Sequence, residues 1–406
     1  MTTNSPFHIM AKPIGAVCNL DCEYCFYLEK ENLYPGTSNF SMNREVQESF
    51  IQQYINSQPG NMVYFAWQGG EPTLLGLDFF KRAIELQQRH ANGKIIENSI
   101  QTNGVVINDD WASFFKEHNI LIGISIDGPE KFHDKYRVTK GKKGSFNKVM
   151  RGLSYLQKHE VPFNTLTVVQ NHNSQFPLDI YHFLKEIGSN FMQFIPIVER
   201  IGNSKSPDGL QLLSPDSPQQ AEVSKWSVNA EQYGTFLCEI FNEWVRQDVG
   251  SYYIQLFDVA LEAWLGLSPS LCVFNETCGN ALAIEHNGDL YSCDHYVYPE
   301  NKLGNILEQT MQKLVDSDQQ RTFGTNKKTT LPNYCKKCEV RFACNGECPK
   351  HRFIKTPDGE DGLNYLCAGY KKFFNHIDPY MRFMANELKN RRAPSNVMKW
   401  VNEISH

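Results

Sequence analysis

The sequence lacks the features of a secreted or membrane protein. Its first residues, MTTNSPFHIMAKP, contain no basic segment followed by an apolar run, and no uninterrupted apolar stretch reaches the ~18 residues of a membrane-spanning helix. A strong charge of either sign is also missing, because the formal net charge is -5 over 406 residues, which argues against a general nucleic-acid binder. We therefore expect a cytoplasmic protein with neither a membrane nor a nucleic acid as partner.

Cysteine, in contrast, is abundant, with twelve residues in the chain. Disulfides are rare in the reducing cytoplasm, whereas metal and cluster sites are common there. Three cysteines lie near the N-terminus, eight lie in the last third, and Cys238 stands alone on an amphipathic stretch where we interpret it as core filler. This distribution fits one open three-thiolate site and two closed four-thiolate sites.

The first two hundred residues alternate short apolar runs with amphipathic ones, which predicts βα units around a parallel sheet. Helices are expected between the strands, the first of them beginning after Ser41 as its cap. Six βα units fit an α/β fold, a partial (βα)6 barrel with its chemistry at the carboxyl ends of the strands. The strands are expected at residues 7–12, 62–67, 95–101, 120–126, 163–169 and 191–197.

Composition divides the rest of the chain. A low-complexity stretch at 201–225 is rich in Ser, Pro, Gly, Asp and Gln and predicts a surface excursion. Two helical stretches follow at 229–247 and 251–266, then a hairpin around Asn287 to Asp289 and a helical tail. The expected parts are a barrel at 1–200, an excursion or linker at 201–228, bridging helices at 229–270, a cysteine-rich domain at 271–370 and the tail at 371–406.

The N-terminal cysteines, Cys18, Cys22 and Cys25, have the spacing C-x3-C-x2-C. A structural zinc site normally takes four protein ligands, so a compact trio leaves one position open. Three thiolates can hold three corners of a four-iron, four-sulfur cube and leave the fourth iron for an exogenous ligand. The alternative is a zinc knuckle that recruits a distant fourth ligand.

This spacing, placed directly after the first predicted strand, resembles the signature of the radical S-adenosylmethionine superfamily. The resemblance implies that the amino and carboxylate groups of S-adenosylmethionine chelate the free iron. It further implies that electron transfer cleaves the cofactor to a deoxyadenosyl radical. Tyr24 matches the superfamily's aromatic position next to the adenine.

The segment WQGGEP, residues 67–72, ends the second predicted strand. Paired glycines let the backbone approach a ligand closely, and the segment is similar to the GGEP element that meets the methionyl amino group in these radical enzymes. Gly69, Gly70 and Glu71 are therefore candidates for cofactor binding. The alternative is an ordinary βα turn with a glutamate near a helix start.

The fourth predicted strand ends in ISIDGP at 124–129. Ser125, Asp127 and Arg137 resemble the group that contacts the ribose and carboxylate of the cofactor in the sulfatase-maturase family. Alternatively, Asp127 is a turn residue and Arg137 a solvated cation. One departure concerns the fifth strand: TLTVVQNHN contains no glycine, whereas many superfamily members carry a glycine-rich segment there.

The C-terminal cysteines are too dense and regular for packing alone. Zinc is one interpretation, since four-cysteine sites commonly bind it. The pattern also resembles the SPASM extension of peptide-modifying radical enzymes, which implies two auxiliary clusters and three [4Fe-4S] clusters in total. By that resemblance the first auxiliary set is Cys272, Cys278, Cys293 and Cys348. The second is Cys335, Cys338, Cys344 and Cys367.

Two longer segments, HIMAKPIGAVCNLDCEYCFYLEKENLYP and RFACNGECPKHRF, resemble the anaerobic sulfatase-maturating enzymes, with the excursion at 201–225 outside the match. The resemblance implies oxidation of a sulfatase Cys or Ser to formylglycine, with Asp294 at the position of the family's proposed general base. A carboxylate beside a cluster can take a proton while the electron leaves through the metal. Without the family, Asp294 would simply end a hairpin strand.

The resemblance also implies the partners. These are a sulfatase polypeptide as substrate and an electron donor such as a flavodoxin or ferredoxin, with the enzyme expected to be a monomer. Two other functions remain open: a related maturase that crosslinks a ribosomal precursor peptide, and a zinc-stabilised interaction protein without catalysis.

Overall fold

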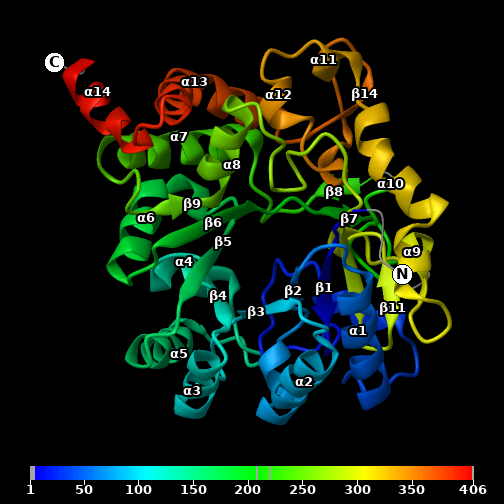
Figure 1. Cartoon of the computed structure of the whole chain (residues 1–406). Helices are drawn as coiled ribbons and strands as arrows, with labels where there is room; N and C mark the ends of the chain where they lie inside the picture. The colour runs from blue at the N-terminus through cyan, green and yellow to red at the C-terminus, as the bar shows by residue number, and fades with distance from the viewer. Residues whose placement is uncertain (1–4, 207–208, 218, 220, 405–406) are drawn as a thin grey trace.

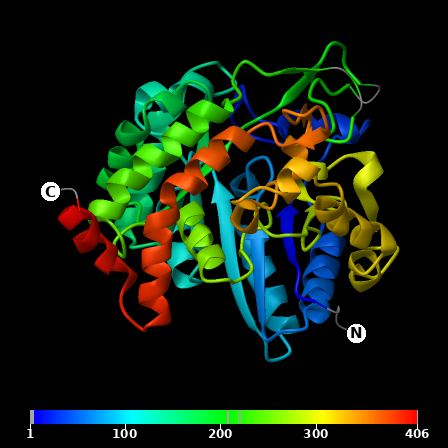
Figure 2. The ribbon, with the colours of Figure 1, turned by 90° about the horizontal axis from the view of Figure 1, so that it is seen from above.

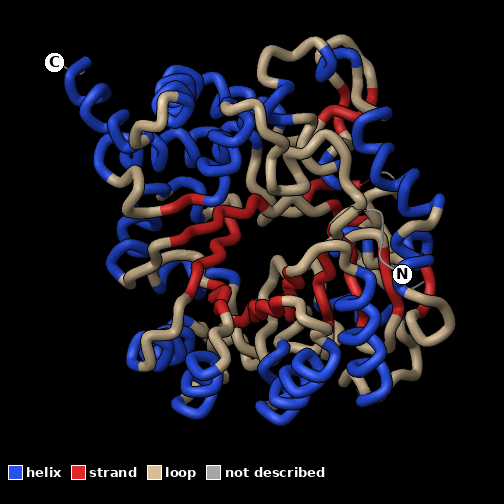
Figure 3. Tube along the Cα trace, viewed as in Figure 1, coloured by secondary structure: helices blue, strands red, loops and turns tan. Residues whose placement is uncertain are grey.

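The computed structural model describes residues 5–206, 209–217, 219 and 221–404, so the outermost ends of the expected first and last domains and part of the expected excursion lie outside the described residues. Its centre is a ten-stranded sheet in the order β12-β11-β10-β1-β2-β3-β4-β5-β6-β9. Figure 3 shows that the strands follow an open curve with helices on the outside.

The first six strands pair in parallel and in sequence order. Each agrees with the predicted strand to within one residue at either end, and buried residues, apolar ones or threonines, recur at every second position in them. The α/β fold with a partial barrel is thus confirmed. The strands are β1 (His8–Lys12), β2 (Met62–Trp67), β3 (Ile95–Thr102), β4 (Leu121–Ser125), β5 (Phe163–Val169) and β6 (Phe191–Pro196).

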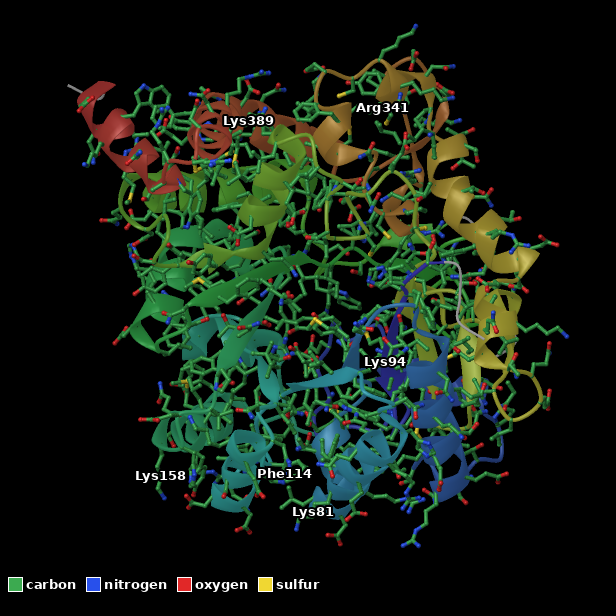
Figure 4. All side chains as sticks on the ribbon, in the orientation of Figure 1. Lys81, Lys94, Phe114, Lys158, Arg341 and Lys389 are labelled. Atoms are coloured by element: carbon green, nitrogen blue, oxygen red, sulfur yellow. The ribbon has the colours of Figure 1, made fainter. Side chains whose placement is uncertain are left out.

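Helices connect these strands and cover the outer face of the sheet (Figure 1). Figure 4 shows Lys81 and Lys158 on the outer side of these helices, far from Arg341 in the C-terminal part of the chain. The predicted cap of the first helix was wrong, because Asn43 rather than Ser41 accepts the hydrogen bond from the amide of Val46. The helices are α1 (Arg44–Ser57), α2 (Leu77–His90), α3 (Asp109–Glu117), α4 (Glu130–Tyr136), α5 (Phe146–Lys158) and α6 (Pro177–Glu186).

The cysteine-rich part of the chain continues the barrel sheet. Strand β10 (Ala281–Glu285) pairs in parallel with β1, and its hairpin partner β11 (Asp289–Tyr291) and then β12 (Lys302–Asn305) extend the sheet further. The hairpin is confirmed, but its attachment to β1 was not predicted. In this register Lys12 lies opposite Glu285, so the two parts of the molecule share one hydrogen-bonded ladder.

Between the barrel and this region, β7 (Arg200–Gly202) and β8 (Ala221–Val223) form a small antiparallel pair, followed by α7 (Ala230–Gln247) and α8 (Gln255–Trp264). The helix predicted from residue 251 begins later, since Tyr253–Ile254 form β9 and pair with β6 at the other end of the sheet.

The last part of the chain is mostly helical and loop-rich. The long helix α13 (Cys367–Lys389) packs against α7, and Figure 2 shows the two side by side. Within the described residues, no helix is long and apolar enough to cross a membrane. The remaining elements are α9 (Met311–Val315), α10 (Asp318–Thr329), α11 (Asn333–Lys336), α12 (Arg341–Cys344), β13 (Ile354–Lys355), β14 (Asp361–Leu363) and α14 (Val397–Ile404).

Candidate active site

The N-terminal cysteines lie on the loop that follows β1, at the carboxyl ends of the barrel strands. Gly69, Gly70 and Glu71 form the turn after β2, the GGE turn, which contacts one side of this loop through backbone hydrogen bonds. Gly70 N donates to Gly15 O at 2.7 Å, and Glu71 N donates to Val17 O at 2.8 Å. A Cβ at Gly70 would lie 1.9 Å from Val17 O, so only glycine allows the two backbones to approach so closely.

The Glu71 carboxylate, which is buried, joins the ends of β2 and β3. It accepts hydrogen bonds from Thr73 N at 3.1 Å, Thr102 Oγ1 at 2.7 Å and Asn103 N at 2.7 Å. Burial raises the pKa of Glu71, against the lowering effect of these hydrogen bonds. The described contacts of the GGE turn thus shape the cysteine loop, and its contact with a cofactor stays a prediction.

The three N-terminal thiols face a common region. Burial is the main cause that raises the pKa of Cys18 and Cys25 to about 11 and that of Cys22 to about 12, and the charge of Cys25 contributes to the rise at Cys18 and Cys22. The Arg137 guanidinium acts in the opposite direction on Cys22 and Cys25. Such thiols hold their protons until a metal replaces them, which fits a thiolate ligand set.

Three of the predicted cofactor residues meet beside this loop. Tyr24 Oη donates to Asp127 Oδ2 at 2.5 Å, and Arg137 Nε lies 3.1 Å from the same oxygen. The Arg137 guanidinium also lies 5.5 Å from the centre of the Tyr24 ring. Ser125 stands apart from this group and accepts a hydrogen bond from Gln101 Nε2 at 2.9 Å.

The eight C-terminal thiols form two groups. The charges of Cys348 and Cys272 raise the pKa of Cys293, and the charge of Cys272 also raises the pKa of Cys278. The other four interact among themselves: Cys344 with Cys367 and Cys335, and Cys367 with Cys335 and Cys338. These charge effects show which thiols are neighbours, and the assignment of the two ligand sets stays a prediction from the SPASM resemblance.

Two buried or half-buried cations support these loops. Lys327 Nζ donates to the carbonyl oxygens of Cys272 at 2.6 Å and Val273 at 2.8 Å, and its charge lowers the pKa of Cys272 and Cys278 against the effect of burial. Arg352 donates to the carbonyl oxygens of Gly346, Asn345 and Glu347. Positive charge beside clustered thiols fits an anionic thiolate-bound group.

Among the described residues, no three His, Cys, Asp or Glu side chains have the spacing of a preformed site for a single metal ion. In a four-iron cluster each thiolate binds a different iron, whereas the ligands of one zinc ion converge to ~2.3 Å from the same atom. The assignment of each cysteine set to a cluster stays a prediction from its donor chemistry.

Asp294 lies immediately after Cys293, at the start of a short 3-10 turn, Asp294–Tyr296. Its side chain is 16 % exposed and forms an ion pair with Lys12, the last residue of β1. Burial raises the pKa of Asp294, but the Lys12 ammonium and, to a smaller extent, other neighbours bring it below its usual value. The carboxylate is therefore ionised at neutral pH and can accept a proton.

Comparisons with known proteins identify the family. Residues 13–184 match the model of the radical SAM superfamily, and residues 272–339 match an iron-sulfur cluster-binding domain, SPASM. The chain is 51% identical over 98% of its length, and over 97% of the relative, to a protein from Bacteroides thetaiotaomicron named serine-type anaerobic sulfatase-maturating enzyme. The chain belongs to the anaerobic sulfatase-maturating enzymes.

Other members of the family show the same relation. A cysteine-type anaerobic sulfatase-maturating enzyme from Clostridium novyi is 34% identical over 95% of this chain and 98% of its own. The solved structure of native anSMEcpe with bound AdoMet and Cp18Cys peptide superposes with a TM-score of 0.81 and 32% identity, covering 94% of this chain and 99% of that one. The predicted family, fold and enzyme class are confirmed.

Sequence reasoning missed several residues that hold the site of this family member in place. His133 is one: Asp127 N donates to His133 Nδ1 at 3.3 Å, so its Nε2 carries the proton towards Ser145 Oγ at 3.0 Å. Burial lowers the pKa of His133 well below its usual value. Lys12 and Asn103 were also missed, since a single polar residue at a strand end gives no sequence signal.

Proposed function

We propose that this chain oxidises an active-site Ser or Cys of a sulfatase to formylglycine. The observation that carries the proposal is the position of Asp294, which stands beside a thiol of the first C-terminal set and is paired with a lysine of the barrel. The names of the relatives support the same substrate class. Because the Bacteroides relative at 51% identity is named serine-type, we propose serine as an accepted target.

The residues present fit the cofactors that the family implies. Cys18, Cys22 and Cys25 would hold one [4Fe-4S] cluster with an open iron, and the two C-terminal sets would hold one auxiliary cluster each. The Tyr24, Asp127 and Arg137 group would bind S-adenosylmethionine. When bound, S-adenosylmethionine supplies a hydrogen-abstracting carbon radical and the clusters supply electrons and an electron acceptor.

A residue of the chain then accepts the proton that the substrate releases. The substrate side chain loses a hydrogen atom from Cβ, a proton from its hydroxyl or thiol, and one further electron. Asp294, ionised beside Lys12, accepts the proton. A serine gives the aldehyde directly, whereas a cysteine gives a thioaldehyde that water hydrolyses to the aldehyde and hydrogen sulfide.

The remaining partners follow from the same proposal. A flavodoxin or ferredoxin would supply the reducing electron, and we propose a monomer that works in the cytoplasm.

The test is an anaerobic incubation of the reduced, cluster-reconstituted enzyme with S-adenosylmethionine and sulfatase peptides that carry either Ser or Cys. We expect an aldehyde, detected by hydrazine derivatisation and by mass, with one deoxyadenosine formed per product. Asp294→Asn should keep cofactor cleavage and lose most of the aldehyde. Deoxyadenosine without aldehyde from either peptide would contradict the proposal and favour the crosslinking maturase, which a precursor peptide would then reveal through ring formation.

A further inference from the structure

We propose that Lys12 is a positioning residue for Asp294, so that the barrel supplies the cation that completes the proton-accepting site of the C-terminal region. The inference rests on the proposed function, because it assumes that Asp294 accepts the substrate proton. It adds a residue from the opposite side of the domain boundary, on a strand that carries no cysteine.

The surroundings of the Lys12 ammonium are specific. The side chain is 2 % exposed, and Nζ lies 3.1 Å from Gln68 Oε1 and 3.4 Å from Met10 Sδ, with the Tyr27 ring centre 4.6 Å away. These three partners are neutral and come from the barrel and its cysteine loop. The only anion that forms an ion pair with Lys12 in the described structure is Asp294. A buried ammonium needs such a counter-charge.

The other acid close to Lys12 is already engaged. Glu285 lies opposite Lys12 in the β1–β10 ladder, but its carboxylate receives the hydroxyl of Tyr27 and faces His286. The Lys12 ammonium also acts to lower the pKa of Glu285, but its direct ion pair is with Asp294. Because β10 leads through the hairpin to Cys293, the ladder register also sets how close Asp294 comes to β1.

The contact orients the carboxylate as well as balancing its charge. Lys12 meets Asp294 at Oδ1, and among the described residues no hydrogen bond reaches Oδ2. One oxygen is thus held by the barrel, and the other is available to the substrate hydroxyl or thiol. Without the ammonium, the carboxylate would lose the contact that fixes its orientation.

The experiment compares Lys12→Met, Lys12→Arg and a matched control in the reconstituted holoenzyme with S-adenosylmethionine and the serine peptide. The control is Lys302→Met, which removes another lysine–aspartate pair of the same sheet, between Lys302 and Asp289 at 2.7 Å. Each variant is measured for iron content, for the KM of the peptide, for kcat, and for the ratio of deoxyadenosine to aldehyde.

For Lys12→Met we expect unchanged iron, a peptide KM within about twofold of wild type, and a kcat for aldehyde lowered by at least about tenfold, with deoxyadenosine formed in excess. Lys12→Arg should recover part of the kcat because it keeps the charge. Lys302→Met should behave as wild type. The double variant of Lys12→Met with Asp294→Asn should be no slower than Asp294→Asn alone, since both act on one step.

Three results would overturn the proposal. Loss of iron from Lys12→Met would show a structural role, and a raised KM with unchanged kcat would show a substrate-binding role. Additive losses in the double variant would separate Lys12 from Asp294. These results differ from a failure of the proposed function, in which the wild-type enzyme itself cleaves the cofactor and forms no aldehyde.

Discussion

The N-terminal cysteine trio and the two C-terminal sets differ in how the fold assembles them. The trio comes from one loop of eight residues, which is held by the ends of β2 and β3 through the GGE turn and Asn103. Each C-terminal set is collected from distant segments, and cations such as Lys327 hold their loops by the carbonyl oxygens. The N-terminal cysteines are thus placed by one local loop, whereas the C-terminal cysteines are brought together from distant segments of the chain.

This difference in assembly corresponds to a difference in what the two kinds of cysteine site do. A loop with three thiolates leaves one coordination position of the cluster for an exchangeable ligand. It needs a rigid support, because that ligand enters and leaves. A four-thiolate set is complete within the protein and also ties its loops together, as structural metal sites do. Substitutions in the two regions should therefore have different consequences.

The sharpest test of the comparison is Cys22→Ala. Loss of one of three ligands should remove the N-terminal cluster and abolish both deoxyadenosine and aldehyde formation, while iron falls from about twelve to about eight atoms per chain. Iron and sulfide analysis with product chromatography measures this. Cys238→Ala, a buried cysteine on α7, is the matched control and should change neither quantity. Retained cofactor cleavage in Cys22→Ala would break the comparison.

Removing a C-terminal ligand should give the contrasting result. Cys348→Ala should lower iron by about four atoms per chain, keep some cofactor cleavage at the N-terminal site, and lose aldehyde. Because the ligand set also ties loops together, thermal unfolding should begin at a lower temperature than in Cys22→Ala. Equal loss of deoxyadenosine in both variants would mean that the two sites do not work independently.

Gly70→Ala tests the close backbone contact between the GGE turn and the N-terminal cysteine loop. The added Cβ would lie 1.9 Å from Val17 O, so the cysteine loop must move. We expect a loss of stability of about 1–3 kcal/mol in urea unfolding and weaker binding of the N-terminal cluster. At Gly60, where nothing lies within 4 Å of such a Cβ, the same substitution should be harmless.

Lys327→Met is the matching test in the C-terminal region. It removes the ammonium that binds the carbonyl oxygens of Cys272 and Val273, so the first auxiliary set should lose iron while the N-terminal cluster is kept. The neighbouring Lys328, half exposed and paired with Glu276, provides the control Lys328→Met. Iron analysis after a chelator challenge should show faster loss only in the Lys327 variant.

The smallest effect concerns His133, which supports the Asp127 loop. Its pKa is depressed in the folded protein by burial, so below pH 6.5 the unfolded chain takes up a proton that the folded chain does not. Stability should fall with decreasing pH there, by up to ~1.4 kcal/mol per pH unit from this residue. His133→Gln should flatten the slope of stability against pH, measured by urea unfolding.

The sequence predicted well whatever depends on neighbouring residues. The six barrel strands are short apolar runs, the trio lies within eight residues, and the hairpin turn contains Asn287 and Gly288. In each case the deciding interactions are local in the chain. For the same reason the GGE segment was located correctly, although its backbone contacts with the cysteine loop were not foreseen.

Long-range features could not be predicted in this way. Strand β10 has no local feature that directs it to β1, because pairing depends on the shape of the finished barrel. Lysine is ordinarily exposed, so nothing in the sequence marks Lys12 as buried. The predicted grouping of the eight cysteines came from the family resemblance, because nothing in the run from Cys335 to Cys348 indicates that Cys348 lies near Cys272.

The ladder between β1 and β10 has a practical consequence for dissecting the enzyme. A shortened chain that stops before β10 would leave the amides and carbonyls of β1 unpaired, and such a bare edge invites association with other chains. An isolated barrel should therefore be poorly soluble even with its own cluster intact. Transplanting a foreign C-terminal module onto this barrel requires that the module bring a strand able to cap that edge.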